Sequence, residues 1–129
     1  MRDIDTRVEA IHIGADDVLY HNQNASLTDI NLWTGQALIA TATTTAKRIA
    51  VAVNEISPVA GLDLFYTAMD DTLYRIAQSS NGWNWGTPVL LNAATHKAKE
   101  LAVAVNQDGR LYHIWQVSPG SSWSAPAPL

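Results

Sequence analysis

Apolar and polar positions alternate with a period of two along most of this chain. Val8–Ile13 alternates in this way, a cluster of turn-forming residues follows, and Val18–His21 resumes the pattern. The segments 62–69 and 72–78 repeat the arrangement around a pair of aspartates. A period of two is typical of strands with one buried face, and Asp-rich clusters favour tight turns. The pattern therefore predicts a series of β-hairpins.

The same signals predict about ten strands in all and an all-β fold. The expected strands lie near residues 8–13, 18–23, 36–40, 48–53, 62–69, 72–78, 87–92, 99–105, 110–117 and 124–128.

Two alanine-rich segments, Gly35–Val53 and Ala93–Val105, allow a competing helical interpretation. Residues 41–45 contain four threonines, whose β-branching disfavours a helix. In both segments valines stand two positions apart, as on one face of a strand. We therefore expect strands here.

Three sequence elements recur in the same order along the chain, which indicates duplication. They are a Lys-led strand at 47–54 and, 52 positions later, at 99–106; a Leu-Tyr pair at 17–21, 71–75 and 109–113; and a Trp with small neighbours at 33–35, 85–88 and 123–126. We divide the single domain 1–129 into units 1–47, 48–98 and 99–129.

The last unit is abbreviated. Tyr20 and Tyr74 are 54 positions apart, whereas Tyr74 and Tyr112 are only 38 apart. In the middle unit the segment Glu55–Thr72 has room for one more strand than the last unit has.

Four-stranded antiparallel sheets recurring every 40 to 50 residues are typical of β-propeller blades. At this length the chain holds about two and a half blades, while propellers usually have about four to eight. We therefore expect a homo-oligomer that completes the ring, a dimer first and a trimer second. The N-terminal unit begins at its second strand, so a partner could supply its first.

Composition excludes several classes of function. The net charge is −4, with 8 basic and 12 acidic residues, so the basic surface that binds nucleic acid is missing. There is no cysteine for a disulfide or a thiol nucleophile. No signal peptide and no stretch long enough to cross a membrane is visible, so we expect a soluble chain whose localisation stays open.

Residues Leu111–Gly120, followed by Trp123 and Ser124, resemble the β-propeller lectins of the Photorhabdus lectin and tectonin-like type. The best match covers Ala102–Trp123, with weaker echoes at 71–88 and 17–33. Its Trp-Gln pair, Trp115 and Gln116, appears only in the last unit. The resemblance implies a blade scaffold that binds a monosaccharide such as fucose or a methylated sugar in clefts between blades.

Sugar recognition needs an aromatic face for the C–H side of the ring and polar groups for its hydroxyls. The candidate ligand-binding residues are Tyr20, His21, Trp33, Tyr74, Arg75, Trp83, Trp85, Tyr112, His113, Trp115 and Trp123. Trp83 is the strongest candidate, because its loop neighbours are turn formers. The alternative is that the repeated Trp and His positions only pack between sheets. No cofactor and no metal is expected.

Catalysis has weaker support. Residues 79–85 are loosely similar to the Asp-box turn of sialidases, which marks a fold and carries no chemistry. The aspartate pairs at 16–17 and 70–71 recur at turns, where Asp is favoured for backbone reasons, and no phosphate loop, metal spacing or Ser-His-Asp pattern is present. We expect a non-enzymatic carbohydrate-binding module. The alternative is a protein-interaction or structural propeller module, with a sialidase-like glycosidase fragment third.

Overall fold

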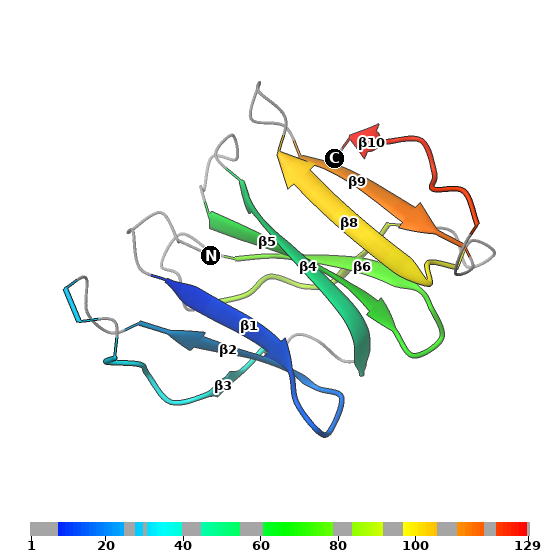
Figure 1. The fold of residues 1–129 in the computed structure, drawn as a ribbon. Coiled ribbons are helices and arrows are strands. Elements are labelled where there is room, and N and C mark those ends of the chain that lie inside the picture. Colours follow the sequence, from blue (N-terminus) through cyan, green and yellow to red (C-terminus); the bar gives the residue numbers. More distant parts are fainter. Residues whose placement is uncertain are drawn as a thin grey trace.

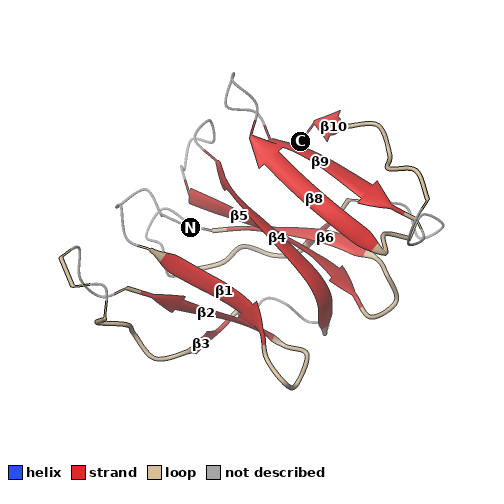
Figure 2. Ribbon diagram, in the orientation of Figure 1, coloured by secondary structure: helices blue, strands red, loops and turns tan. Residues whose placement is uncertain are grey.

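The computed structural model describes residues 8–24, 28–29, 31–39, 45–54, 61–78, 84–91, 97–105, 111–117 and 121–128. The described residues form strands and connections and contain no helix (Figure 2). The strands are β1 (Glu9–Ile13), β2 (Leu19–Gln23), β3 (Ala37–Leu38), β4 (Ala46–Asn54), β5 (Gly61–Ala68), β6 (Leu73–Ala77), β7 (Val89–Leu90), β8 (Glu100–Val105), β9 (Leu111–Gln116) and β10 (Ala127–Pro128). The all-β expectation is confirmed, and the alanine-rich segments β4 and β8 are strands.

The strands form three antiparallel sheets. The first sheet has the order β1-β2-β3, the central sheet β4-β5-β6-β7, and the last sheet β10-β9-β8. In Figure 1 the three sheets follow one another across the molecule, and β1, β4 and β8 lie side by side. None of the sheets closes on itself within the described residues.

Two apolar clusters hold the sheets together. Between the first and central sheets, the buried core includes Leu19, Leu64 and Ile76, with the side chains of β1 and β4 packed against it. Between the central and last sheets, Phe65 and Leu111 are the largest buried members of a smaller cluster. β2 therefore buries alternate side chains, as the period of two predicts, whereas β5 has an apolar cluster on each side and is buried along its whole length.

The two described hairpin turns are built alike. Asp17 and Asp71 have φ values of 61° and 67°, in the left-handed region. One residue earlier, the carboxylates of Asp16 and Asp70 accept hydrogen bonds from the backbone N–H groups of residues 18 and 72. Aspartate tolerates both roles, so the expectation that these pairs are turn residues is confirmed. The third expected turn, 107–110, lies outside the described residues.

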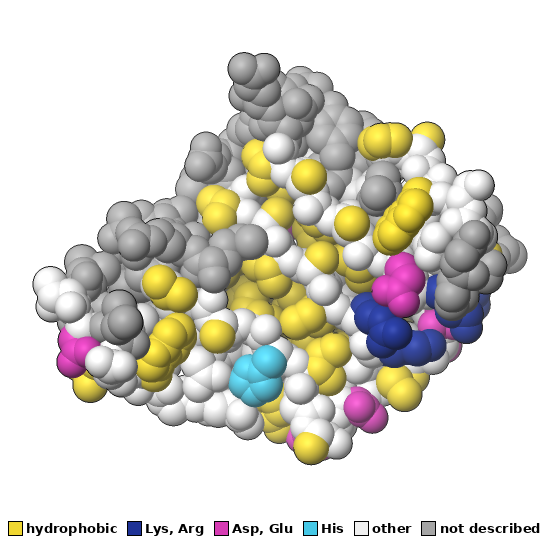
Figure 3. Space-filling model, viewed as in Figure 1, with side chains coloured by type: hydrophobic (Ala, Val, Ile, Leu, Met, Phe, Trp, Pro, Cys, Tyr) yellow, Lys and Arg dark blue, Asp and Glu magenta, His cyan; other side chains and the backbone are white. Residues whose placement is uncertain are grey.

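Each turn also fastens the next sheet. The carbonyl of Asp17 accepts a hydrogen bond of 2.7 Å from the N–H of Ala46, and that of Asp71 accepts one of 2.8 Å from Ala98. The Asp71 carboxylate in addition forms ion pairs with Lys47 and Lys99. In Figure 3, basic and acidic side chains gather near the start of β8, while apolar side chains spread over the area between β1 and β4.

The last sheet lacks one strand. In the central sheet β5 lies between β4 and β6, whereas β8 pairs directly with β9. This confirms that the segment after position 55 holds a strand with no counterpart in the last unit. It also turns β9 over, because Val103 lies opposite His113 and both face the central sheet, where His113 stacks on Phe65. In the central sheet the corresponding Arg75 points the other way, toward the last sheet.

Candidate functional site

Three tryptophans occupy matching places, one beside each sheet. Trp33, Trp85 and Trp123 form backbone bridges with the residues that follow β2 and β6 and with the last residue of β9, namely Asn24, Gln78 and Gln116. The next residue after each Trp, at positions 34, 86 and 124, donates its N–H to the strand at 2.8, 2.8 and 2.9 Å. The same backbone pairing thus places the three tryptophans at equivalent positions of their sheets.

Side chains reinforce two of these three places. The hydroxyl of Thr34 accepts a hydrogen bond of 2.9 Å from the N–H of Gln23, and that of Ser124 accepts one of 3.1 Å from Trp115. Gly86 stands at the third place and has no hydroxyl. The amides of Asn24 and Gln116 each donate to a carbonyl five residues later, that of Asp29 and of Ser121, which ties a residue ahead of each Trp to the strand.

The three tryptophans differ in exposure. Trp33 and Trp123 are 43% and 45% exposed, whereas Trp85 is 9% exposed. The edge of the Trp85 ring meets His21 of the first sheet at a centroid distance of 5.8 Å. The structure therefore places Trp85 in the core between two sheets, while Trp33 and Trp123 keep nearly half of their surface exposed to solvent.

The three predicted donors at the matching position of β2, β6 and β9 face neighbouring sheets. His21 and His113 are buried, and this burial lowers the pKa of each imidazole because it disfavours the charged form. Arg75 makes a two-pronged ion pair with the buried Asp63, at 2.9 and 3.0 Å. His21 and His113 therefore contribute to packing between sheets, while Arg75 is paired with β5 of its own sheet.

The predicted tyrosines Tyr74 and Tyr20 differ in position, one in the core and one on an outer face. Tyr74 stacks on Tyr66 at 5.3 Å within the core. Tyr20 lies on the outer face of the first sheet, stacks on His12 at 5.7 Å and donates a hydrogen bond of 2.7 Å to Asp16. This bond lowers the pKa of Asp16 and raises that of Tyr20.

Of the remaining candidates, Trp115 is partly exposed and stacks on His113 at 5.5 Å. Tyr112 pairs through its backbone with β8 and β10, and its side chain lies outside the description. Trp83, the strongest candidate from the sequence, also lies outside the described residues.

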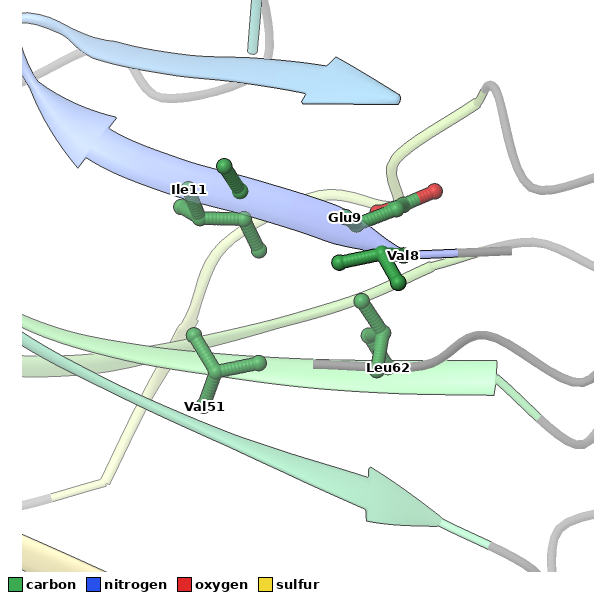
Figure 4. Close-up of a pocket in the computed structure, with 6 residues that line it drawn as sticks. Val8, Glu9, Ile11, Val51 and Leu62 are labelled. Carbon is green, nitrogen blue, oxygen red and sulfur yellow. The ribbon is translucent and has the colours of Figure 1, made fainter. Parts of the chain in front are cut away.

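A cavity of about 410 Å³ lies between the first and central sheets (Figure 4). Its lining is apolar apart from Glu9, and comprises Val8, Glu9, Ala10, Ile11, Val51 and Leu62. The buried Glu9 carboxylate accepts hydrogen bonds from the amides of Gln78, at 2.9 and 3.0 Å, and of Gln23, at 3.3 Å. The sequence analysis missed Glu9. Its signal was a carboxylate on the same strand face as the partly buried Ile11 and Ile13.

Within the described part of the chain, no group of three or more acidic or histidine side chains is placed to hold a metal ion. The described residues also include no helix long and apolar enough to cross a membrane.

Comparison with models of known protein families gives no match, and comparison with curated proteins finds no similar chain.

Proposed function

We propose that this chain is a non-catalytic carbohydrate-binding module of the lectin type, built from propeller-like blades. Its ligand class is a neutral or methylated monosaccharide such as fucose. The observation that carries the proposal is the pair of exposed tryptophans, Trp33 and Trp123, held by matching hydrogen bonds. A fixed aromatic face binds the apolar side of a pyranose without losing side-chain freedom on binding.

The outer face of the first sheet, which carries Trp33, also carries polar groups of the kind that sugar hydroxyls require. The amide of Asn22 donates to the Thr34 carbonyl at 3.3 Å, and the His12 imidazole is 3.1 Å from the Gln36 amide oxygen. Together these groups include both hydrogen-bond donors and acceptors, and a sugar hydroxyl can pair with either. Display on a homo-oligomer would add avidity on a glycan-coated surface.

The test is a titration with fucose, galactose, mannose, N-acetylglucosamine and their methyl glycosides, followed by tryptophan fluorescence. We expect at least one sugar to change the emission in a saturable way, because exposed indoles respond to a ring stacked on them. A flat response to every sugar would reject the proposal in favour of a protein-interaction module, which shares the exposed apolar residues but not the sugar response.

A further inference from the structure

Side-chain alternation gives each sheet two different faces. In the first sheet Leu19 and His21 face the central sheet, so Tyr20 and Asn22 lie on the outer face. In the central sheet the matching Tyr74 and Ile76 point toward the first sheet, on the side where Trp85 is buried. The face that carries the Trp is thus covered in the central sheet and open in the first.

The last sheet is turned over, and this opens a second face of the same kind. Leu111 and His113 point back to the central sheet. Ala102, Ala104 and Trp123 are exposed, with the two alanines on the opposite face of β8 from the packed Val103. Both ends of the three-sheet stack therefore present a Trp-bearing face.

Among the described strands, no sheet of this chain covers either open face. Trp85 is covered by the face that carries Leu19 and His21. The two other faces of that kind, which carry Leu73 and Arg75 in the central sheet and Leu111 and His113 in the last sheet, face each other across the second apolar cluster. A second copy of the chain therefore has no free face of the kind that covers Trp85. It could not cover Trp33 or Trp123 in the same way.

The first sheet is also altered at the positions that face outward. Where the central sheet has Leu64, Tyr66 and Ile76 in the core, the matching positions of the first sheet hold Ala10, His12 and Asn22. Small and polar side chains replace large apolar ones. This change suits a surface that meets water and hydroxyl groups better than one that meets another sheet.

We propose that the outer faces of the first and last sheets are two separate saccharide sites, with Trp33 as the aromatic platform of one and Trp123 of the other. A single chain would then hold two sugars at opposite ends. This inference rests on the proposed function. Because His12, Asn22 and Gln36 surround the first face with polar groups, we expect the Trp33 site to bind more tightly.

The indole N–H signals of the five tryptophans can be followed in ¹⁵N-labelled protein. The probes are the methyl glycosides of fucose, galactose, mannose and N-acetylglucosamine. We expect the Trp33 and Trp123 signals to shift on titration and the buried Trp85 signal to stay in place. The variants Trp33→Ala and Trp123→Ala assign the signals, and Trp33→Phe keeps an aromatic platform if the alanine variant fails to fold.

Each single variant should lose binding at its own site by roughly tenfold or more, while the other site keeps its affinity. Met69→Ala, an exposed apolar change at the β5–β6 turn, is the matched control and should change neither site. If no sugar shifts any indole signal, the proposed function itself fails. If a sugar binds while the Trp33 and Trp123 signals stay unchanged, only the two-site inference fails. A Trp33 or Trp123 signal that moves with protein concentration would show that a second copy covers the face instead.

Discussion

At the scale of single residues, the turn aspartates were predictable and the histidines were not. Asp16, Asp17, Asp70 and Asp71 stand where the backbone requires them, and turn chemistry depends on local sequence alone. His21 was predicted as a sugar donor, yet it lies under Trp85. Alternation tells which face a side chain is on, but only the tertiary structure tells what covers that face.

The left-handed conformation of Asp17 leads to a test of backbone strain. Asp17→Val should lower the free energy of unfolding by about 1–2 kcal/mol, because a β-branched residue is strained at positive φ. Asp17→Gly should leave it unchanged or raise it, since glycine adopts this conformation freely but gains entropy in the unfolded chain. Urea unfolding of the two variants measures the difference. Equal stability of the valine and glycine variants would contradict the turn geometry.

The buried histidines make stability depend on pH. Burial lowers the pKa of His21 and His113 in the folded state. As pH falls below the ordinary histidine value of about 6.5, the unfolded chain takes up protons that the folded chain does not, so stability decreases. It should decrease until the lowered folded pKa values are reached.

The measurement is the urea midpoint at a series of pH values from neutral to mildly acidic. We expect the double variant His21→Gln, His113→Gln to flatten the dependence in this range, and His12→Gln, on the outer face, to keep it. A midpoint that falls equally steeply in the double variant would assign the effect to other groups.

At the scale of elements, all ten strands could be predicted from hydrophobic alternation and turn signals. The orientation of β9 could not. The sequence shows that the last unit is short, but which face of β9 turns inward depends on its register with β8. A shift of one residue exchanges the two faces. The orientation of β9 also decides whether Trp123 is covered, so this part of the candidate site could not be placed from the sequence.

A variant that removes the ion pairs of Asp71 tests how the central and last sheets are joined. Asp71→Asn keeps a residue that tolerates positive φ but removes the charge that Lys47 and Lys99 share. Because this carboxylate is largely buried, we expect a loss of about 1–3 kcal/mol of stability. Asp70→Asn, at an exposed position in the same turn, should cost less. Equal thermal shifts for the two variants would argue against a role in joining the sheets.

At the scale of the whole molecule, the number of sheets followed from the repeat, while their closure did not. Strand spacing predicts blade-like sheets but carries no information on what meets the two ends of the stack. Among the described strands, β1, β4 and β8 lie side by side and each stands at the edge of its sheet, a place where another chain can add.

We expect a homo-oligomer, a dimer before a trimer, joined through such edges with Trp33 and Trp123 left open. Light scattering coupled to size exclusion should give a mass that is a multiple of 14.0 kDa. A stable species of 14.0 kDa at micromolar concentration would reject the oligomer and leave the two end faces as the source of multivalency.

The reversed β9 limits how the stack of sheets could be lengthened. An array lengthens when its terminal unit offers the face that each inner unit offers its successor. Leu111 and His113 already point backward, so a unit fused after the last sheet would find no such face. A sheet fused before the first sheet would meet the Tyr20 face, where Ala10, His12 and Asn22 replace the Leu64, Tyr66 and Ile76 that the first sheet covers within the chain. Neither end therefore offers the apolar face of the inner junctions, and a version of this protein lengthened at either end should gain little stability from the added sheet.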